Sequence, residues 1–564
     1  MRVTKNTKII LAIVIPLVIL IGAFTACFLT VDIPPSFQYH VSVSEENPQT
    51  LHVDMTISMP WLCKKQDVYV YLGNKNIRLR SCTDSSGKEQ TPAVSNGIAA
   101  IPVSRGGAIH IDYDVSVAVS AKHGNRGAIT DDYIVFDGDQ VFLLPAEFYV
   151  FDEDGVKNAV NRIDMSFQFP EDWKKIIPFE EIENPQWIDI YKITKNAFVF
   201  GQFDETQNPD TGLNVYTLPG QTVDGTEGFD SLFAYYTDLF GSKPSSYNIV
   251  LLPSDDSGEK IMGGAGTGTV AASFDPDALR DWQLLSHRMF HAFYDNAAPY
   301  VNVHAAPNLW LNEGLATYYE NLATDALPED LKSKLGVDVK RQMALTFDQY
   351  LYMRLKDPFS YNFAPMDENQ ITSEAMSEFL HYTTAPLIVQ AFEKISLEQG
   401  NEPNALLRYC LEESSFEDRY TALTAAMDLL GSEAQSFCEN YLIGVEIPPL
   451  WDLKEYQPSS TEVLDSLNYI EILLGSWQKK GNEDYPTHIV SEEELEKAMS
   501  AMGDRNISLL PTEVGEQLKE YCPEIYALVA DYYYQAEEKG FELDDKDLRF
   551  KMYQEESLND ELSN

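Results

Sequence analysis

The chain has 564 residues and carries 88 acidic against 41 basic side chains, which gives a formal net charge of −47. Its length predicts several domains of about 150 residues each, and an apolar content of 44% excludes a globally disordered chain. The acidic excess excludes a nucleic-acid partner, because such proteins present a basic surface to phosphate. It fits either a solvated acidic exterior or attraction of cationic substrates and divalent ions.

The N-terminal segment has the composition of a membrane anchor. Arg2, Lys5 and Lys8 precede an almost uninterrupted apolar run at residues 9–31, close to the ~20 residues that cross a bilayer as a helix. We predict a cytoplasmic tail at residues 1–8 and a single-pass transmembrane helix at 9–31 in the cell membrane. The positive flank makes the bulk of the chain extracytoplasmic. A cleaved or lipidated signal is the alternative, because residues 24–27, Phe-Thr-Ala-Cys, faintly resemble a lipoprotein signal.

The cysteines allow disulfides but do not form a pattern typical of a metal site. Disulfides Cys63–Cys82 and Cys410–Cys438 are possible outside the cell, although connectivity cannot be deduced from sequence. The chain has no Cys-x-x-Cys pair. A thiolate zinc site is therefore not expected.

Short alternating runs dominate residues 37–201, for example Leu-His-Val-Asp-Met-Thr-Ile at residues 51–57. Gly, Asn and Asp clusters separate these runs, which is typical of a β-sandwich or a large curved sheet. The polar composition of residues 202–222 indicates a linker or an exposed loop. We predict a β-rich N-terminal domain at residues 37–218.

The pattern becomes helical in the second half. A helix over residues 229–240 and a strand at 247–253 precede a glycine-rich segment at 262–268. Asp275-Pro276 signals a helix start, and Pro307 precedes a second helix. Helical patterns continue through residues 326–446 and, beyond Pro448-Pro449, through 450–564, which ends in an acidic tail.

Three residues on the two helices after residue 275 have the spacing of a zinc site. His287 and His291 are four residues apart, so a helix presents them on one face. Glu313 on the next helix can complete a three-ligand site that leaves one position open. In the working motif H-E-x-x-H, a glutamate follows the first histidine and acts as general base. Arg288 stands at that position here.

The string Leu-Trp-Leu-Asn-Glu-Gly at residues 309–314, together with His287 and His291, resembles the membrane alanyl-aminopeptidase family of gluzincin zinc metallopeptidases. The likeness covers roughly residues 37–400. The 21 residues between His291 and Glu313 exceed the family's spacing. The chain therefore looks like a degenerate member of that family.

This resemblance implies a multidomain α+β fold with Zn²⁺ as cofactor. It would comprise the N-terminal transmembrane helix, a β-rich sandwich-like domain and a gluzincin (thermolysin-like) metallopeptidase domain at residues 223–325. Residues 326–446 would be the helical part of the peptidase domain, followed by the C-terminal helical region at 450–564.

The resemblance also suggests roles for residues around the ligands. Tyr382 sits where the family has an oxyanion-stabilising tyrosine, although Thr384 and Ala385 break the surrounding string. The alternative for Tyr382 is a packed helical aromatic. Glu320 lies two turns after Glu313 and would either hydrogen-bond a ligand histidine or face solvent.

The glycine-rich segment is the second departure from the family. Gly264, Ala265 and Gly266 are candidate substrate-binding residues through their backbone N–H groups, or else part of a flexible turn. The family's acidic anchor for a substrate amine is missing from this segment.

Three functions remain open from sequence. We favour an impaired or inactive peptidase that retains zinc and binds a peptide or protein partner, since a guanidinium cannot accept a proton. An active metallopeptidase that uses another carboxylate, such as Asp281, is the first alternative. A structural surface protein without metal is the second.

Overall fold

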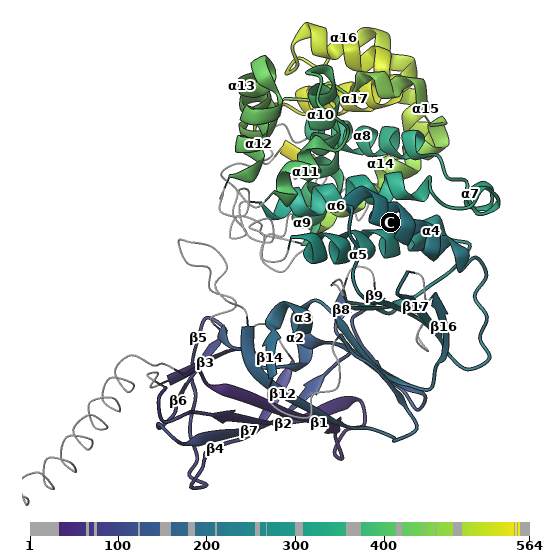
Figure 1. Ribbon diagram of the computed structural model, residues 1–564. Coiled ribbons are helices and arrows are strands. Elements are labelled where there is room, and N and C mark those ends of the chain that lie inside the picture. Colours follow the sequence, from purple (N-terminus) through teal and green to yellow (C-terminus); the bar gives the residue numbers. More distant parts are fainter. Residues whose placement is uncertain are drawn as a thin grey trace, which may run out of the picture. The chain divides into compact units, whose positions relative to one another are not determined.

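The computed structural model describes most of the chain beyond residue 32 (Figure 1). The described residues are 33–63, 67–72, 76–121, 124–146, 160–178, 186–208, 211–253, 260–264, 266, 268–298, 308–356, 374–412, 420–444, 446–456, 458–477, 488–545, 548–549 and 551–552.

The chain divides into two compact units. Unit 1 comprises Met1–Val223 and Pro244–Phe274, and unit 2 comprises Asp224–Lys243 and Asp275–Asn564. Strands make up most of the first unit and helices most of the second, so the predicted mixed α+β, multidomain architecture is confirmed. The units follow different borders from the predicted domains, which remain predictions.

A six-stranded sheet forms the main layer of unit 1, in the order β14-β12-β1-β2-β7-β4 (Figure 1). The alternation of apolar and polar residues explains why these segments form a sheet with one buried face. In β2, every second side chain from Leu51 to Ile57 is buried, while its neighbours face outward. β1 pairs antiparallel with β2 but parallel with β12. The strands are β1 (Ser36–Val43), β2 (Thr50–Ser58), β4 (Ile77–Asp84), β7 (Ala108–Ser116), β12 (Val160–Gln168) and β14 (Gln186–Asp189).

Smaller sheets complete unit 1. A four-stranded sheet has the order β10-β11-β15-β13, a five-stranded sheet β16-β17-β18-β20-β19, and a three-stranded sheet β3-β6-β5. The strands are β3 (Asp67–Tyr71), β5 (Ala93–Ser95), β6 (Ile98–Pro102), β10 (Ala128–Ile129), β11 (Tyr133–Asp137), β13 (Lys174–Ile176), β15 (Ala197–Gly201), β16 (Asp204–Asn208), β17 (Leu213–Thr217), β18 (Tyr247–Leu252), β19 (Met262–Gly263) and β20 (Thr269–Ser273).

Unit 2 is helical. Two of its helices, α5 and α6, carry the predicted ligands. Gly314 allows the close approach of α6 to α10, since a Cβ there would lie 2.7 Å from the Cβ of Ala385. The helices are α4 (Glu227–Phe240), α5 (Leu279–Ala297), α6 (Leu309–Thr324), α7 (Glu329–Leu335), α8 (Val339–Lys356), α9 (Glu374–Phe379), α10 (Ala385–Glu398), α11 (Ala405–Leu411), α12 (Thr421–Leu429), α13 (Ala434–Phe437), α14 (Ser460–Trp477), α15 (Glu492–Ala501), α16 (Thr512–Tyr521) and α17 (Pro523–Glu538).

The predicted anchor at residues 9–31 lies outside the described residues. Within the part of the chain that the structure describes, no helix combines the length and apolarity needed to span a bilayer. The possible disulfides Cys63–Cys82 and Cys410–Cys438 are not formed: all four side chains are buried thiols.

Asp348 makes the stability of unit 2 depend on pH. This carboxyl group is buried in α8, and burial raises its pKa to about 8 against the opposing effect of the Tyr521 hydroxyl. In the unfolded chain the pKa returns to about 3.9. Between about pH 4 and pH 8, the folded protein keeps a proton on Asp348 that the unfolded chain loses. Stability therefore falls as pH rises from about 4 to about 8.

We expect Asp348→Asn to remove this pH dependence, because the amide has no proton to lose in that range. Urea unfolding midpoints at pH 5 and pH 8 would measure it. The gap between the two midpoints should shrink in the variant, and an unchanged gap would show that Asp348 does not cause it.

Candidate metal centre

Helix α5 supplies two of the predicted ligands. Its buried side chains include Leu285, Met289 and Phe293, which hold one face in the core. The helix begins at Leu279, later than the Asp275-Pro276 signal suggested, because the backbone N–H of Asp275 donates to the Asp281 carboxylate in a turn before the helix. The later start leaves the two histidines well inside the helix, where backbone geometry fixes their spacing.

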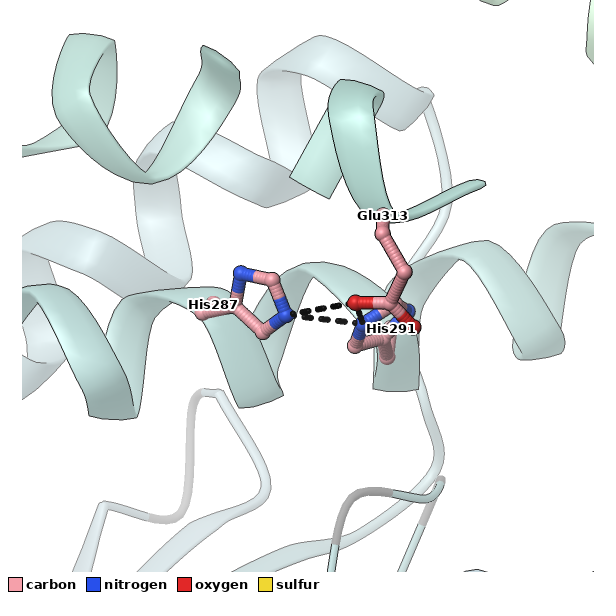
Figure 2. A group of neighbouring side chains, drawn as sticks. All are labelled: His287, His291 and Glu313. Carbon is pink, nitrogen blue, oxygen red and sulfur yellow. Dashed lines mark hydrogen bonds and ion pairs between the residues drawn. The ribbon is translucent and has the colours of Figure 1, made fainter. Parts of the chain in front are cut away.

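The three predicted ligands meet in unit 2, with Glu313 reaching from α6 to the histidines of α5 (Figure 2). The Nε2 atoms of His287 and His291 are 3.0 Å apart. The Glu313 Oε2 atom lies 3.2 Å from Nε2 of His287 and 3.4 Å from Nε2 of His291. Among the described residues, this is the group whose ligand atoms could together hold a metal ion.

This triangle of atoms fits zinc. A tetrahedral zinc ion with bonds of about 2.0–2.1 Å places its ligand atoms about 3.3 Å apart, close to the three distances observed. Two imidazole nitrogens and one carboxylate oxygen are also the donor set of hydrolytic zinc sites with one open position. The geometry of the three residues is therefore compatible with zinc, with His287, His291 and Glu313 as ligands.

Glu320 sets the tautomer of His287. Its Oε2 atom lies 2.8 Å from Nδ1 of His287, so Glu320 can hold a proton on Nδ1 and leave Nε2 as the atom that would bind a metal ion. The other oxygen of Glu320 accepts a hydrogen bond from Arg280 at 2.9 Å. Glu320 is only 2% exposed, so it lies within the core and not on the surface.

The ionisation of two of the three ligands suits a cation. Burial would raise the pKa of Glu313, but interactions with His291 and His287 outweigh it, so the pKa lies well below its ordinary value. Burial lowers the pKa of His291, which favours the neutral imidazole that binds metal. Burial also acts to lower the pKa of His287, but hydrogen bonds to Glu313 and Glu320 outweigh it and raise the pKa, so a metal ion must compete with a proton at this imidazole.

We expect Glu320→Gln to weaken zinc binding by about 10- to 100-fold, the usual effect of removing a group that orients a ligand histidine. Competition with a chromogenic chelator would measure the dissociation constant. Glu329→Gln is the matched control, because Glu329 lies in α7 and pairs with Lys332. Equal affinities for the wild type and Glu320→Gln would contradict this role.

Tyr382 lies beside the ligands on a π-helical turn, Leu380–Thr384, between α9 and α10. Its ring centroid is 5.8 Å from that of His287. The charge of Glu313 and burial raise the pKa of the Tyr382 hydroxyl well above its ordinary value, so it remains a proton donor. Single π-helical turns of this kind occur frequently at functional sites. The oxyanion role stays a prediction.

Arg288 is half-buried and lies on α5 directly after His287, about 100° further round the helix. Its charge acts on Tyr382, where it opposes the rise in pKa caused by Glu313. In sequence, Arg288 occupies the position directly after the first histidine, which a glutamate general base holds in the motif H-E-x-x-H.

The glycine-rich segment belongs to unit 1, whereas the ligands belong to unit 2. Gly264 has φ +76°, and its N–H donates to Asp137 at 2.8 Å. A Cβ on Gly266 would lie 2.7 Å from the carbonyl oxygen of Lys195. Ala265 lies outside the described residues. Close packing explains these two glycines, and their substrate-binding role stays a prediction.

Asp281 is poorly placed to act as a substitute base. Its carboxylate accepts the N–H of Asp275, and it is six residues before His287, roughly 9 Å along the helix axis. Sequence reasoning also missed Arg280, which supports Glu320. The signal was present, since Arg280 and His287 are seven residues apart and share a helix face.

Comparisons with known proteins support the fold. No family model and no curated protein sequence matches the chain. Among solved structures, an aminopeptidase N family protein from Idiomarina loihiensis is 13% identical, with a TM-score of 0.52, over 74% of this chain and 78% of that chain. An M1 zinc metallopeptidase from Deinococcus radiodurans is 16% identical, with a TM-score of 0.46, over 74% and 95%. The Idiomarina match supports the predicted resemblance at the level of the fold alone, and membership as a degenerate peptidase stays a prediction.

Proposed function

We propose that the protein is a zinc-binding, membrane-anchored member of the aminopeptidase-type metallopeptidases that binds peptide or protein partners but hydrolyses peptides poorly. Residues 9–31 would anchor it in the cell membrane with its bulk outside. The observation that carries the proposal is a triangle of ligand atoms that matches zinc, in a motif whose general-base position is occupied by Arg288.

The side chains around the site explain how the protein could bind a peptide without cleaving it efficiently. When bound, zinc would polarise a peptide carbonyl and the water facing it. The Tyr382 hydroxyl, protonated at neutral pH, could donate to the carbonyl oxygen. Arg288 cannot remove the proton of the attacking water, because guanidinium stays charged in proteins. The residues therefore favour holding a carbonyl or carboxylate over breaking the bond.

The two alternatives have less support from the described residues. An active peptidase needs a base that reaches the open position, and Asp281 is engaged at the start of α5. A structural protein without metal has no need for three ligand atoms at the spacing of a zinc site, whereas the Glu313 carboxylate faces the two imidazoles.

Metal analysis of purified protein tests the zinc site. We expect close to one zinc ion per chain in the wild type and a loss of most of it in His287→Ala. His488→Ala is the matched control, because His488 pairs with Glu494 and should leave the zinc content unchanged. Wild-type protein that contains no metal after preparation with zinc would contradict the proposal.

A further inference from the structure

We propose that Trp61 in unit 1 inserts into the interface of the membrane that the anchor enters. This inference rests on the proposed membrane attachment through residues 9–31. Trp61 is 73% exposed, the largest exposure among the large apolar side chains of the described residues. Tryptophan is enriched where protein meets the headgroup region of a bilayer.

A fixed loop presents this side chain. Met59 and Cys63 on either side are buried in the core of unit 1. The N–H of Met59 donates to the carbonyl oxygen of Gly107 at 2.9 Å, and the N–H of Gly106 donates to the carbonyl oxygen of Met59 at 2.9 Å. On the other side of Trp61, the N–H of Cys63 donates to the carbonyl oxygen of Pro60 at 3.0 Å, so backbone bonds hold both flanks of this exposed side chain.

Packing against Gly106 sets the ring in place. Gly106 has φ +72°, and a Cβ there would lie 2.4 Å from Cε2 of Trp61, so only glycine permits the contact. The ring covers the backbone with one part of its surface and leaves the rest to solvent. Burying that remaining apolar surface in lipid is favourable.

The register of the sheet places Trp61 close in the fold to Ser36, the residue at which β1 begins. Ser36, the first residue of β1, pairs with Ser58, the last residue of β2. Trp61 follows Ser58 by three residues. Only residues 32–35 separate the apolar run from Ser36, so the last apolar residue and Ser36 are at most about 18 Å apart. A membrane that holds residues 9–31 therefore lies close to this end of the sheet.

Local charge permits contact with lipid headgroups despite the acidic chain. Arg105 is exposed in the loop next to Gly106, and Arg162 is exposed opposite Ser36 on β12. Asp84, Lys88 and Glu89 lie in one turn at the same end of the sheet, where Lys88 offsets one acid and Asp84 accepts from Ser86 at 2.8 Å. Basic residues close to the bilayer are attracted to an anionic lipid surface.

Quenching by lipids with brominated acyl chains tests the inference in the full-length protein. The segment 1–36 contains no tryptophan, so the anchor itself gives no signal. The chain has seven tryptophans, and we expect vesicles of brominated phosphatidylcholine with phosphatidylglycerol to quench on the order of one seventh of the emission. Trp61→Phe should abolish this quenching.

Two matched variants sharpen the result. Trp173→Phe should keep the quenching, because Trp173 follows the end of β12 that is distant from Ser36. Trp187→Phe should keep it as well, although Trp187 pairs with Arg162 near the same end. Full quenching in Trp61→Phe, or its loss in Trp187→Phe instead, would overturn the inference.

Flotation with vesicles after alkaline carbonate washing separates the two proposals. Protein that floats but shows no quenching of Trp61 retains the anchor and overturns only the inference. Protein that does not float overturns the anchor and, with it, the membrane contact of Trp61. We expect flotation together with quenching that depends on Trp61.

Discussion

Replacing Arg288 with glutamate should raise zinc-dependent peptide hydrolysis by at least about 10²-fold, because a positioned general base contributes about 10²–10⁴-fold to rate. The carboxylate would stand directly after His287, at the position that the general base holds in the motif H-E-x-x-H. It could then accept the proton of the attacking water, which the guanidinium cannot. Initial rates on short peptides at fixed zinc occupancy would measure the gain.

Two control variants distinguish the effect of adding a general base from the effect of removing the positive charge of Arg288. Arg288→Gln removes the positive charge without adding a base, so it should stay near the wild-type rate. The double variant Arg288→Glu with His287→Ala should lose the gained activity together with its zinc. Equal rates for Arg288→Glu and Arg288→Gln would show that the missing base is not what limits hydrolysis.

Glu471→Gln should destabilise unit 2 by about 3–5 kcal/mol, the usual cost of removing one partner from a buried ion pair. Glu471 is fully buried and accepts from Nζ of Lys356 at 2.7 Å and from Arg549 at 2.8 Å. Burial opposes its charge, but these two cations lower its pKa to about 2. Without the carboxylate, two buried cations remain uncompensated.

The urea midpoint of unfolding would measure this loss. Glu520→Gln is the matched control, because Glu520 pairs with Lys454 at the surface and such pairs contribute about 0–1 kcal/mol. We expect a clear shift for Glu471→Gln and little for Glu520→Gln. Similar midpoints for both variants would contradict the structural role of Glu471.

The local features of the site could be predicted from sequence because they depend on helical spacing. His287 and His291 are four residues apart, and the string around Glu313 marks a known type of helix. Glu320 was ambiguous, since spacing alone shows which helix face it occupies but not what packs there. Only the structure shows that it accepts a hydrogen bond from His287.

Long-range pairings could not be predicted in the same way. Alternation showed that residues 51–57 form a strand, but the parallel pairing of β1 with β12 joins segments more than 100 residues apart. The contact of Lys356 with Glu471 likewise joins helices distant in sequence. Such contacts follow from how the elements pack, which a single sequence does not specify.

Zinc content and peptide hydrolysis, measured on the same preparation of wild-type protein, test the central claim most directly. The account predicts close to one zinc ion per chain and hydrolysis at least about 10²-fold slower than that of the Arg288→Glu variant. Efficient hydrolysis by the wild type that disappears in His287→Ala would contradict it, because the site would then be a working peptidase despite Arg288.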